Sequence, residues 1–266
     1  MAANVNFLDS LKDKVVIVTG ASSGIGAQTA VHFAKLGSQV VITGRNAENL
    51  EATKKKCIEA GAESNKIILV IGDVTKASDC KAIVQKAIDS FGRLDCLVNN
   101  AGILVPGSVE VATEDDYNKQ MDANVKSVFL MTSEATPHLI ASKGNVVNVS
   151  SVCGIRAFPG ICVYNMSKAA VDQFTESAAL DLASKGVRVN AVNPGVIVTE
   201  VHKRAGMNEE QYQKYLEHSK TTHALGRVGN VEEVASVITF LASSGASYIT
   251  GAHIPVDGGR HAMCPR

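Results

Sequence analysis

The chain lacks a surplus of charge of either sign. Of its 266 residues, 26 are Lys or Arg and 26 are Asp or Glu, so the formal net charge is zero. Proteins that bind nucleic acid normally carry a basic excess or a concentrated basic patch, because they must neutralise phosphates. The composition therefore argues against a nucleic-acid partner.

Signals for membranes, export and disulfides are also missing. No apolar run reaches membrane-spanning length without glycines or charges interrupting it. The opening residues, Met1 to Phe7, do not resemble a signal peptide. The 6 cysteines form no Cys-x-x-Cys pair and are interpreted as reduced thiols. We therefore expect a cytoplasmic protein without a membrane partner, disulfides or a metal site.

What the chain does contain is an alternation of β-branched runs and amphipathic segments. Strands are predicted at 14–19, 39–43, 66–71, 94–98, 145–149, 188–192 and 253–256. Helices are predicted at 27–36, 46–59, 77–91, 113–141, 164–184 and 231–241. Such strand–helix–strand units build parallel sheets with right-handed crossovers. We expect residues 1–266 to form a single doubly wound Rossmann-type α/β domain.

The first predicted strand ends in a glycine-rich turn that opens a helix. A turn of this kind presents backbone N–H groups and the positive end of a helix dipole to an anion. Glycines let the backbone approach a pyrophosphate closely. We therefore expect the turn to bind the phosphates of a dinucleotide through Gly20, Ser22, Ser23, Gly24, Ile25 and Gly26.

The same turn also matches Gly-x-Ser-x-Gly, the nucleophile elbow of α/β-hydrolases. In that alternative Ser22 is the nucleophile and His253 is a candidate base. The elbow normally follows a strand in the middle of the sheet, whereas this turn follows the first strand. The phosphate-binding interpretation is favoured for that reason.

Arg45 follows the second predicted strand and bears on the choice of dinucleotide. An NAD site usually has Asp or Glu at the end of that strand to accept a hydrogen bond from the ribose 2′-hydroxyl. Here the strand ends in Gly44-Arg45. An arginine–phosphate contact contributes roughly 1.5–3 kcal/mol, so NADP(H) should be preferred over NAD(H) by about one to two orders of magnitude.

Tyr164 and Lys168 are spaced so that a helix places their side chains on one face. A free phenol has a pKa of about 10 and exchanges protons poorly at neutral pH. An ammonium roughly 5 Å away, at an effective dielectric of about 20, favours the phenolate by about 3 kcal/mol. The spacing therefore predicts that Tyr164 transfers protons and that Lys168 lowers its pKa.

Taken together, the motifs resemble those of the short-chain dehydrogenase/reductase family. The resemblance covers about 12–259, and its motifs are Thr19 to Gly26, Asp73, Asn99-Asn-Ala-Gly102, Asn124, Ser151, Tyr164-Asn-Met-Ser-Lys168 and Pro194-Gly195 through Thr199. Members of that family have a seven-stranded parallel sheet with helices on both faces, and many are tetramers. The resemblance implies the same fold and a homotetramer.

The resemblance also implies a catalytic set of Asn124, Ser151, Tyr164 and Lys168. Tyr164 would exchange a proton with the carbonyl oxygen, and Ser151 would hydrogen-bond the same oxygen. Lys168 would also bind the nicotinamide ribose. Asn124 would kink its helix and hold a water that connects Lys168 to solvent.

For the cofactor, the resemblance implies that Asp73 binds the adenine amino group and that Asn99 and Gly102 form the wall beside the adenosine. Thr199 would hold the nicotinamide carboxamide. The remaining contacts would come from Val74, Ala101, Pro194, Gly195, Val196 and Ile197, with Tyr164 and Lys168. The segment 196–224 would form a variable substrate lid.

The tail from Gly226 to Gly259 resembles 3-oxoacyl-carrier-protein reductases and their relatives. We expect an NADP(H)-dependent oxidoreductase that interconverts a small-molecule carbonyl compound and its alcohol. One alternative is an NAD-dependent hydroxysteroid or retinol-type dehydrogenase. Another, from a different class, is a dinucleotide-sensing protein that has lost catalysis. The substrate, the physiological direction and the stereochemistry stay open at this level.

Overall fold

Seven strands form one sheet in the computed structural model, which describes residues 6–264. The order is β3-β2-β1-β4-β5-β6-β7, and every neighbouring pair is parallel. The strands are β1 (Val15–Thr19), β2 (Gln39–Gly44), β3 (Ile67–Ile71), β4 (Cys96–Asn99), β5 (Asn145–Val149), β6 (Arg188–Pro194) and β7 (His253–Val256). The predicted Rossmann-type fold is confirmed.

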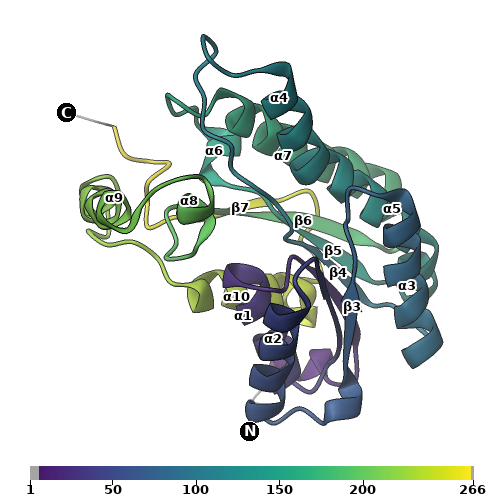
Figure 1. The fold of residues 1–266 in the computed structure, drawn as a ribbon. Helices are drawn as coiled ribbons and strands as arrows, with labels where there is room; N and C mark the ends of the chain where they lie inside the picture. Colours follow the sequence, from purple (N-terminus) through teal and green to yellow (C-terminus); the bar gives the residue numbers. More distant parts are fainter. Residues whose placement is uncertain (1–5, 265–266) are drawn as a thin grey trace, which may run out of the picture.

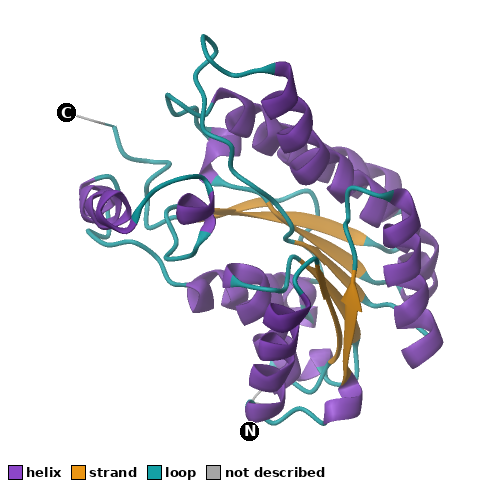
Figure 2. Ribbon diagram, viewed as in Figure 1, coloured by secondary structure: helices purple, strands orange, loops and turns teal. Residues whose placement is uncertain are grey.

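Helices cover both faces of the sheet (Figures 1 and 2). One face carries α1 (Gly24–Lys35), α2 (Ala47–Glu59) and α10 (Val231–Ala242). The other carries α3 (Ala77–Phe91), α4 (Glu114–Met121), α5 (Ser127–Ser142) and α7 (Cys162–Ala183). Because both faces are covered, β1 and β5 are buried at every residue, which explains their unbroken apolar or small-polar sequence.

The order of winding fixes where a ligand can bind. From β1 the chain winds outward to β3, returns to β4 beside β1, and then winds the other way to β7. In such sheets the crevice lies outside the carboxyl ends of the strands, at the point where the direction reverses. Here that point lies between Thr19 at the end of β1 and Asn99 at the end of β4.

Three further helices belong to the segments that follow the carboxyl ends of β5 and β6. They are α6 (Val152–Ile155), α8 (Val201–Arg204) and α9 (Glu209–Thr221). In Figure 1, α8 and α9 lie apart from both helical layers. The segment 196–224, predicted as a lid, contains the two helices α8 and α9, and Asn208 caps α9 in a reciprocal capping box with Gln211.

Most predicted boundaries agree with the structure to within a few residues, and the differences have local causes. The helix predicted over 113–141 is interrupted by a π turn, Asp122–Lys126, which is the irregularity expected at Asn124. The short α6 was not predicted. Its N-cap, Ser151, accepts a hydrogen bond from the Cys153 N–H at 3.1 Å, and four residues are too few to show helical periodicity.

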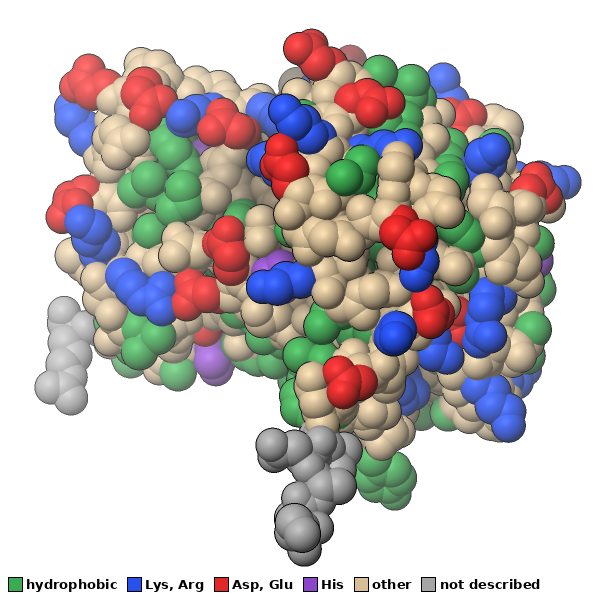
Figure 3. Space-filling view, turned by 90° about the horizontal axis from the view of Figure 1, so that it is seen from below, with side chains coloured by type: hydrophobic (Ala, Val, Ile, Leu, Met, Phe, Trp, Pro, Cys, Tyr) green, Lys and Arg blue, Asp and Glu red, His purple; other side chains and the backbone are tan. Residues whose placement is uncertain are grey.

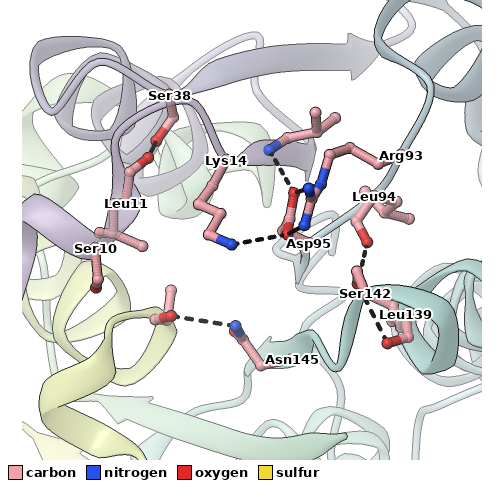
Figure 4. Close-up of polar contacts among 12 residues, drawn as sticks. Ser10, Leu11, Lys14, Ser38, Arg93, Leu94, Asp95, Leu139, Ser142 and Asn145 are labelled. Atoms are coloured by element: carbon pink, nitrogen blue, oxygen red, sulfur yellow. Dashed lines mark hydrogen bonds and ion pairs between the residues drawn. The ribbon is translucent and has the colours of Figure 1, made fainter.

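At the opposite edge of the sheet, the buried carboxylate of Asp95 joins the starts of β1 and β4 (Figure 4). It accepts hydrogen bonds from the Val15 N–H at 3.0 Å and from the Arg93 guanidinium at 2.8 and 2.6 Å. The Lys14 ammonium lies 3.3 Å away. This cluster is far from the ligand-binding edge, so its role is to stabilise the fold.

Replacing Asp95 by Ala should therefore lower stability without changing the site directly. The variant leaves the buried Val15 N–H without its acceptor and removes the charge that both cations face. We expect urea denaturation to show a loss of about 2–3 kcal/mol. Glu59→Ala, which removes an exposed 3.9 Å pair with Lys55, should change it by no more than about 0.5 kcal/mol. Equal effects of the two substitutions would contradict this role.

The described surface agrees with the balanced composition. Lys and Arg side chains are interspersed with Asp and Glu on the face shown in Figure 3. Within residues 6–264, the helices include none that is long and apolar enough to cross a membrane. The same part of the chain holds no cluster of His, Cys, Asp and Glu able to bind a metal ion.

Candidate active site

The glycine turn after β1 has the geometry of an anion site. Gly20 and Gly24 have positive φ angles of 63° and 56°, which L residues with side chains rarely adopt. A Cβ on Gly20 would lie 2.8 Å from the Ala101 Cα, and one on Gly26 would overlap the Asn100 side chain and the Gly20 carbonyl. Among the described residues, no side chain caps α1, and its first turn contains no acid. Its first N–H groups are therefore available to a phosphate.

A second turn, after β4, is hydrogen-bonded to the first. The Thr19 hydroxyl accepts hydrogen bonds from the N–H groups of Asn100 and Ala101, both at 3.0 Å. The Asn100 amide donates to the carbonyls of Thr19 and Gly20 at 2.9 and 3.2 Å. Asn100 belongs to the motif Asn99-Asn-Ala-Gly102, and the sequence did not suggest a role for it. The structure shows that it holds the two turns together.

On the side predicted for adenosine, Arg45 and Asp73 lie close enough for their charges to interact. Asp73 accepts hydrogen bonds from the Thr75 N–H at 3.1 Å and from the Thr75 hydroxyl at 2.9 Å. Burial acts to raise the pKa of Asp73, but the Thr75 hydrogen bonds and the charge of Arg45 outweigh it and hold that pKa below its usual value. Val74 accepts from the Cys80 thiol through its carbonyl. Asp73 is therefore an ionised acceptor here.

The Asn99 side chain does not point into this groove. Its amide donates to the Thr132 hydroxyl at 3.0 Å and to the Asn148 side chain at 2.9 Å, and the residue is buried. Asn148 in turn donates to Thr175 at 2.9 Å. The prediction that Asn99 forms part of the wall beside the adenosine stays a prediction, and it would involve the backbone of Asn99 rather than this buried side chain.

The four residues predicted to be catalytic come from three separate segments and converge near the carboxyl ends of β4 and β5. The Lys168 ammonium donates to the Val149 carbonyl at 2.9 Å and lies 5.7 Å from the centroid of the Tyr164 ring. A Cβ on Gly102 would lie 3.2 Å from the Asn124 side-chain oxygen and 3.7 Å from the Lys168 ammonium. A glycine at 102 therefore allows Asn124 and Lys168, both predicted to be catalytic, to approach the turn after β4 closely.

The sequence argument predicted a net lowering of the pKa of Tyr164, and in this structure the net shift is upward. Burial raises the pKa of Tyr164 well above its usual value, and the nearby Cys153 adds to the rise, while the Ser151 hydroxyl opposes it. Burial also lowers the pKa of Lys168 to about 8, against the opposing charge of Asp172. The sequence argument counted the attraction between the pair but not the cost of burying both groups.

Asn124 lies in the π turn between α4 and α5, and both its side-chain oxygen and its amide group form hydrogen bonds. Its oxygen accepts from the Ile103 N–H at 2.8 Å, and its amide donates to the Ile103 carbonyl at 2.9 Å and to the Ser167 hydroxyl at 3.0 Å. The side chain therefore fixes the loop after β4 against α7. The proposed water relay to Lys168 stays a prediction.

The segment after β6, predicted to hold the nicotinamide, is supported by residues that the sequence did not suggest. The Tyr212 hydroxyl donates to the Thr199 carbonyl at 2.9 Å and lies 3.2 Å from the Thr199 N–H. His223 accepts from the Val196 N–H at 3.1 Å, and a Cβ on Gly195 would lie 2.8 Å from the same imidazole nitrogen. Tyr212 and His223 both come from the predicted lid, whose mixed composition gave no signal for either contact.

The lid also contacts the glycine turn directly. Arg204 on α8 donates to the Ser23 hydroxyl at 3.0 Å. A Cβ on Gly24 would lie 3.3 Å from the Thr199 methyl group. Segments about 180 residues apart thus close over the start of α1, so the lid and the phosphate turn form one site.

The alternative hydrolase interpretation does not fit this geometry. Ser22 follows β1, whereas His253 is on β7, and β4, β5 and β6 separate the two strands. Strands lie about 4.8 Å apart, so the two residues are separated by about 19 Å along the sheet. His253 instead lies 3.1 Å from the Asp172 carbonyl and 3.8 Å from Glu176. It is too far away to activate Ser22.

A Rossmann-type sheet with a tyrosine and a lysine beside a glycine turn defines a class of dinucleotide-dependent oxidoreductases. A family profile described as Enoyl-(Acyl carrier protein) reductase matches residues 20–261. The chain is 40% identical over 250 residues to 3-oxoacyl-[acyl-carrier-protein] reductase FabG of Thermotoga maritima. The match covers 94% of this chain and 98% of that protein.

Solved structures agree with these sequence matches. A short-chain dehydrogenase/reductase of unknown function from Caenorhabditis elegans, crystallised with cofactor, gives a TM-score of 0.92 at 39% identity, covering 96% of this chain and 97% of that one. Levodione reductase gives a TM-score of 0.90 at 32% identity, covering 95% and 99%. The chain belongs to the short-chain dehydrogenase/reductase family, as its motifs predicted. It is an oxidoreductase of a family that uses NAD(P)(H).

Proposed function

We propose that this protein is an NADP(H)-dependent reductase of ketones or aldehydes, similar to 3-oxoacyl reductases. The observation that carries the proposal is the convergence of Tyr164, Lys168 and Ser151 at the crevice that begins at the glycine turn. The relatives support it in kind, since one is named a 3-oxoacyl-[acyl-carrier-protein] reductase and one a levodione reductase.

The residues of the groove fit a dinucleotide. The uncapped start of α1 and the close contacts at Gly20 and Gly26 suit a pyrophosphate, and the ionised Asp73 suits an amino group. When bound, NADP(H) supplies or accepts the hydride at the carbonyl carbon. Thr199 would hold the nicotinamide end, where Tyr212 fixes its backbone.

The chain's own residues would manage the proton. The raised pKa of Tyr164 keeps the phenol protonated at neutral pH, so it can donate to the carbonyl oxygen as that oxygen becomes negative. Ser151 would hydrogen-bond the same oxygen and orient it. Lys168 remains largely protonated at neutral pH because its pKa is about 8, so its charge stabilises the phenolate left after transfer.

The proposal is tested by following NADPH oxidation across acyl thioesters, steroids, retinoids and small α-dicarbonyl compounds. We expect turnover with at least one carbonyl class. Binding of NADPH without turnover of any class would instead favour the dinucleotide-sensing alternative.

The choice of NADP(H) over NAD(H) rests on Arg45. This arginine is exposed at the end of β2, and the neighbouring Gly44 faces the Ser22 hydroxyl, which would lie 3.3 Å from a Cβ there. A 2′-phosphate placed between Arg45 and Ser22 would have a cation and a hydroxyl as partners. The alternative NAD-dependent dehydrogenase lacks such support, because no carboxylate ends β2.

Replacing Arg45 by Asp should reverse this preference. We expect the KM for NADPH to rise by about 10- to 100-fold, because the phosphate contact is replaced by repulsion. The KM for NADH should stay within about 3-fold or fall, since an acid at this position can accept from a ribose hydroxyl. Steady-state kinetics with both cofactors measure the split. Equal changes in the two KM values would remove Arg45 from the assignment.

We further propose that residues 1–266 form a single domain on which 196–224 acts as a substrate lid.

We also propose that the chain forms a homotetramer. A groove of about 410 Å³ runs between α5 and α7, lined mainly by apolar side chains that include Phe129, Val171 and Phe174. Phe129 is 55% exposed, which supports a partner at this face. Light scattering should give four chain masses, and a monomer would contradict the proposal.

The described cysteines support a reducing location. All six thiols are free in the structure, including Cys264 near the chain end. We propose that the protein works in the cytoplasm, where thiols stay reduced.

A further inference from the structure

Arg260 follows β7 in a tightly fixed turn. Gly258 and Gly259 have φ angles of 57° and 81°, and the buried Asp257 accepts hydrogen bonds from the Gly259 N–H at 3.0 Å and the His261 N–H at 2.6 Å. Asp257 also lies 2.9 Å from the His261 imidazole. Both carboxylate oxygens are therefore occupied, and this acid is not the partner of Arg260.

The guanidinium of Arg260 is partly buried and lacks a counter-ion. Its carbon atom lies 4.5 Å from the centroid of the Phe158 ring, in the loop between Ser151 and Tyr164. Its Nε atom is buried without a hydrogen-bond partner, although the Tyr215 hydroxyl lies within hydrogen-bonding reach of the guanidinium. None of the ion pairs found within residues 6–264 includes Arg260. Buried N–H groups are rarely left unpaired, because each costs about 1–3 kcal/mol. A missing acceptor would explain this one.

Arg260 lies within the electrostatic neighbourhood of the reacting centre. Its charge acts on Cys153, Tyr215 and His202, and two of these, Cys153 and Tyr215, also act on Tyr164. Tyr215 comes from the lid helix α9, and its ring lies 4.5 Å from that of His202. Arg260 therefore lies beside the loop that joins Ser151 to Tyr164 and close enough to the lid residue Tyr215 for their side chains to interact.

Apart from Asp257, whose carboxylate is taken up by its own turn, the groups on which Arg260 acts supply no negative charge at pH 7. Burial raises the pKa values of Cys153 and Tyr215 and lowers those of His202 and His223. Lys168 is the other cation that acts on Cys153, and its ammonium donates to the Val149 carbonyl at 2.9 Å, so Arg260 is the cation without such a partner. One guanidinium matches a singly charged carboxylate, whereas a phosphate dianion would call for further cations.

We propose that Arg260 binds a carboxylate of the substrate, so that the enzyme acts on oxo acids and the corresponding hydroxy acids rather than on uncharged ketones. The proposal rests on the reductase function given above and names its substrate class. The carbonyl would face Tyr164 and Ser151, the carboxylate would occupy the acceptor position at Arg260, and the rings of Phe158 and Tyr215 would pack on the part between them.

Matched acids and esters test this charge requirement. Benzoylformate, β-benzoylpropionate and γ-benzoylbutyrate place the carboxylate at increasing distances from an aryl ketone, and their methyl esters remove the charge. With wild-type enzyme and NADPH, we expect at least one acid to exceed its ester in kcat/KM by about 30-fold. In Arg260→Gln that ratio should fall to about one, mainly through KM for the acid, while Arg260→Lys restores part of it.

Binding measured without chemistry separates this proposal from the proposed function. Calorimetric titration of the same acids and esters into Tyr164→Phe enzyme saturated with NADPH reports the carboxylate contact even if no compound is reduced. We expect the preferred acid to bind about 30-fold tighter than its ester, and the difference to vanish when Arg260→Gln is added.

Arg156→Gln is the matched control, because Arg156 is exposed and donates only to the Met263 carbonyl at 3.2 Å. It should leave the acid-to-ester ratio unchanged, and thermal melts should confirm that each variant folds. If acids and esters bind equally to the wild-type site, or if Arg260→Gln weakens both equally, Arg260 is a structural residue and the proposal is wrong. Absence of turnover together with acid-selective binding would overturn the reductase function but keep the carboxylate site.

Discussion

Replacing Tyr164 by Phe is expected to remove turnover almost completely while NADPH still binds. The phenol carries a proton at neutral pH and contacts the Ser151 hydroxyl. Phenylalanine keeps the ring and its packing but has no proton to give. A positioned general acid contributes about 10² to 10⁴ in rate, so kcat should fall by at least about 10²-fold.

Cofactor binding and folding serve as the internal controls for Tyr164→Phe. The Kd for NADPH, measured by calorimetry or by the change in NADPH fluorescence on binding, should stay within about 3-fold, because the glycine turn is untouched. Tyr248→Phe is the matched control, since that side chain is fully exposed. Retention of more than a tenth of the wild-type kcat in Tyr164→Phe would show that another group supplies the proton.

Replacing Lys168 by Met should separate activity from stability. The buried ammonium stabilises charge on Tyr164 and is proposed to bind the nicotinamide ribose, so its loss should lower kcat by at least about 10²-fold and raise KM for NADPH. Met has a similar length and needs no solvation. Turnover and cofactor affinity should therefore both fall, unlike in Tyr164→Phe, where only turnover falls.

The free energy of unfolding of Lys168→Met, unlike its activity, should not fall. Burial lowers the pKa of Lys168 from 10.5 to about 8, so the folded protein carries the cost of a buried ammonium at neutral pH. That cost is on the order of 3 kcal/mol, although Met also loses the 2.9 Å contact with the Val149 carbonyl. We expect the free energy of unfolding of Lys168→Met at pH 7 to equal or exceed that of the wild type.

The pH dependence supplies a sharper test. Between the folded pKa of about 8 and the unfolded value of 10.5, the unfolded chain holds a proton that the folded protein has released. The wild type should therefore gain stability relative to Lys168→Met as pH rises from about 7 to about 9.5. The variant pair cancels the contributions of the other titrating groups. Lys185→Met, at an exposed position after α7, should show no such trend, and a flat difference for Lys168→Met would contradict the buried ammonium.

Local sequence was enough for the elements and for most of the phosphate site. Hydrophobic periodicity over a strand or helix depends on residues a few positions apart, so β1, α3 and β5 could be predicted to within a residue or two. Glycines at 20, 24 and 26 were also interpretable, because the turn that needs them is itself local.

Polar networks between distant segments were not predictable in the same way. Asp95 pairs with Lys14, Asn99 with Asn148, and Tyr212 with Thr199 through contacts set by how strands and lid pack together. The sequence alone offers many acceptors for each donor. Asn99 is an example, since its motif gave no indication that its side chain would be buried and bonded to Thr132 and Asn148.

The chain by itself determined its fold class, its family and the residues that face the proposed chemistry. Only the tertiary structure decided the electrostatics of that site. Tyr164 and Lys168 are neighbours in both descriptions, but burial, which sequence spacing does not reveal, raises the pKa of the phenol and lowers that of the amine. Burial also leaves Arg260 beside Phe158 without a counter-ion, since desolvation depends on everything that surrounds a group and not on its position in the chain.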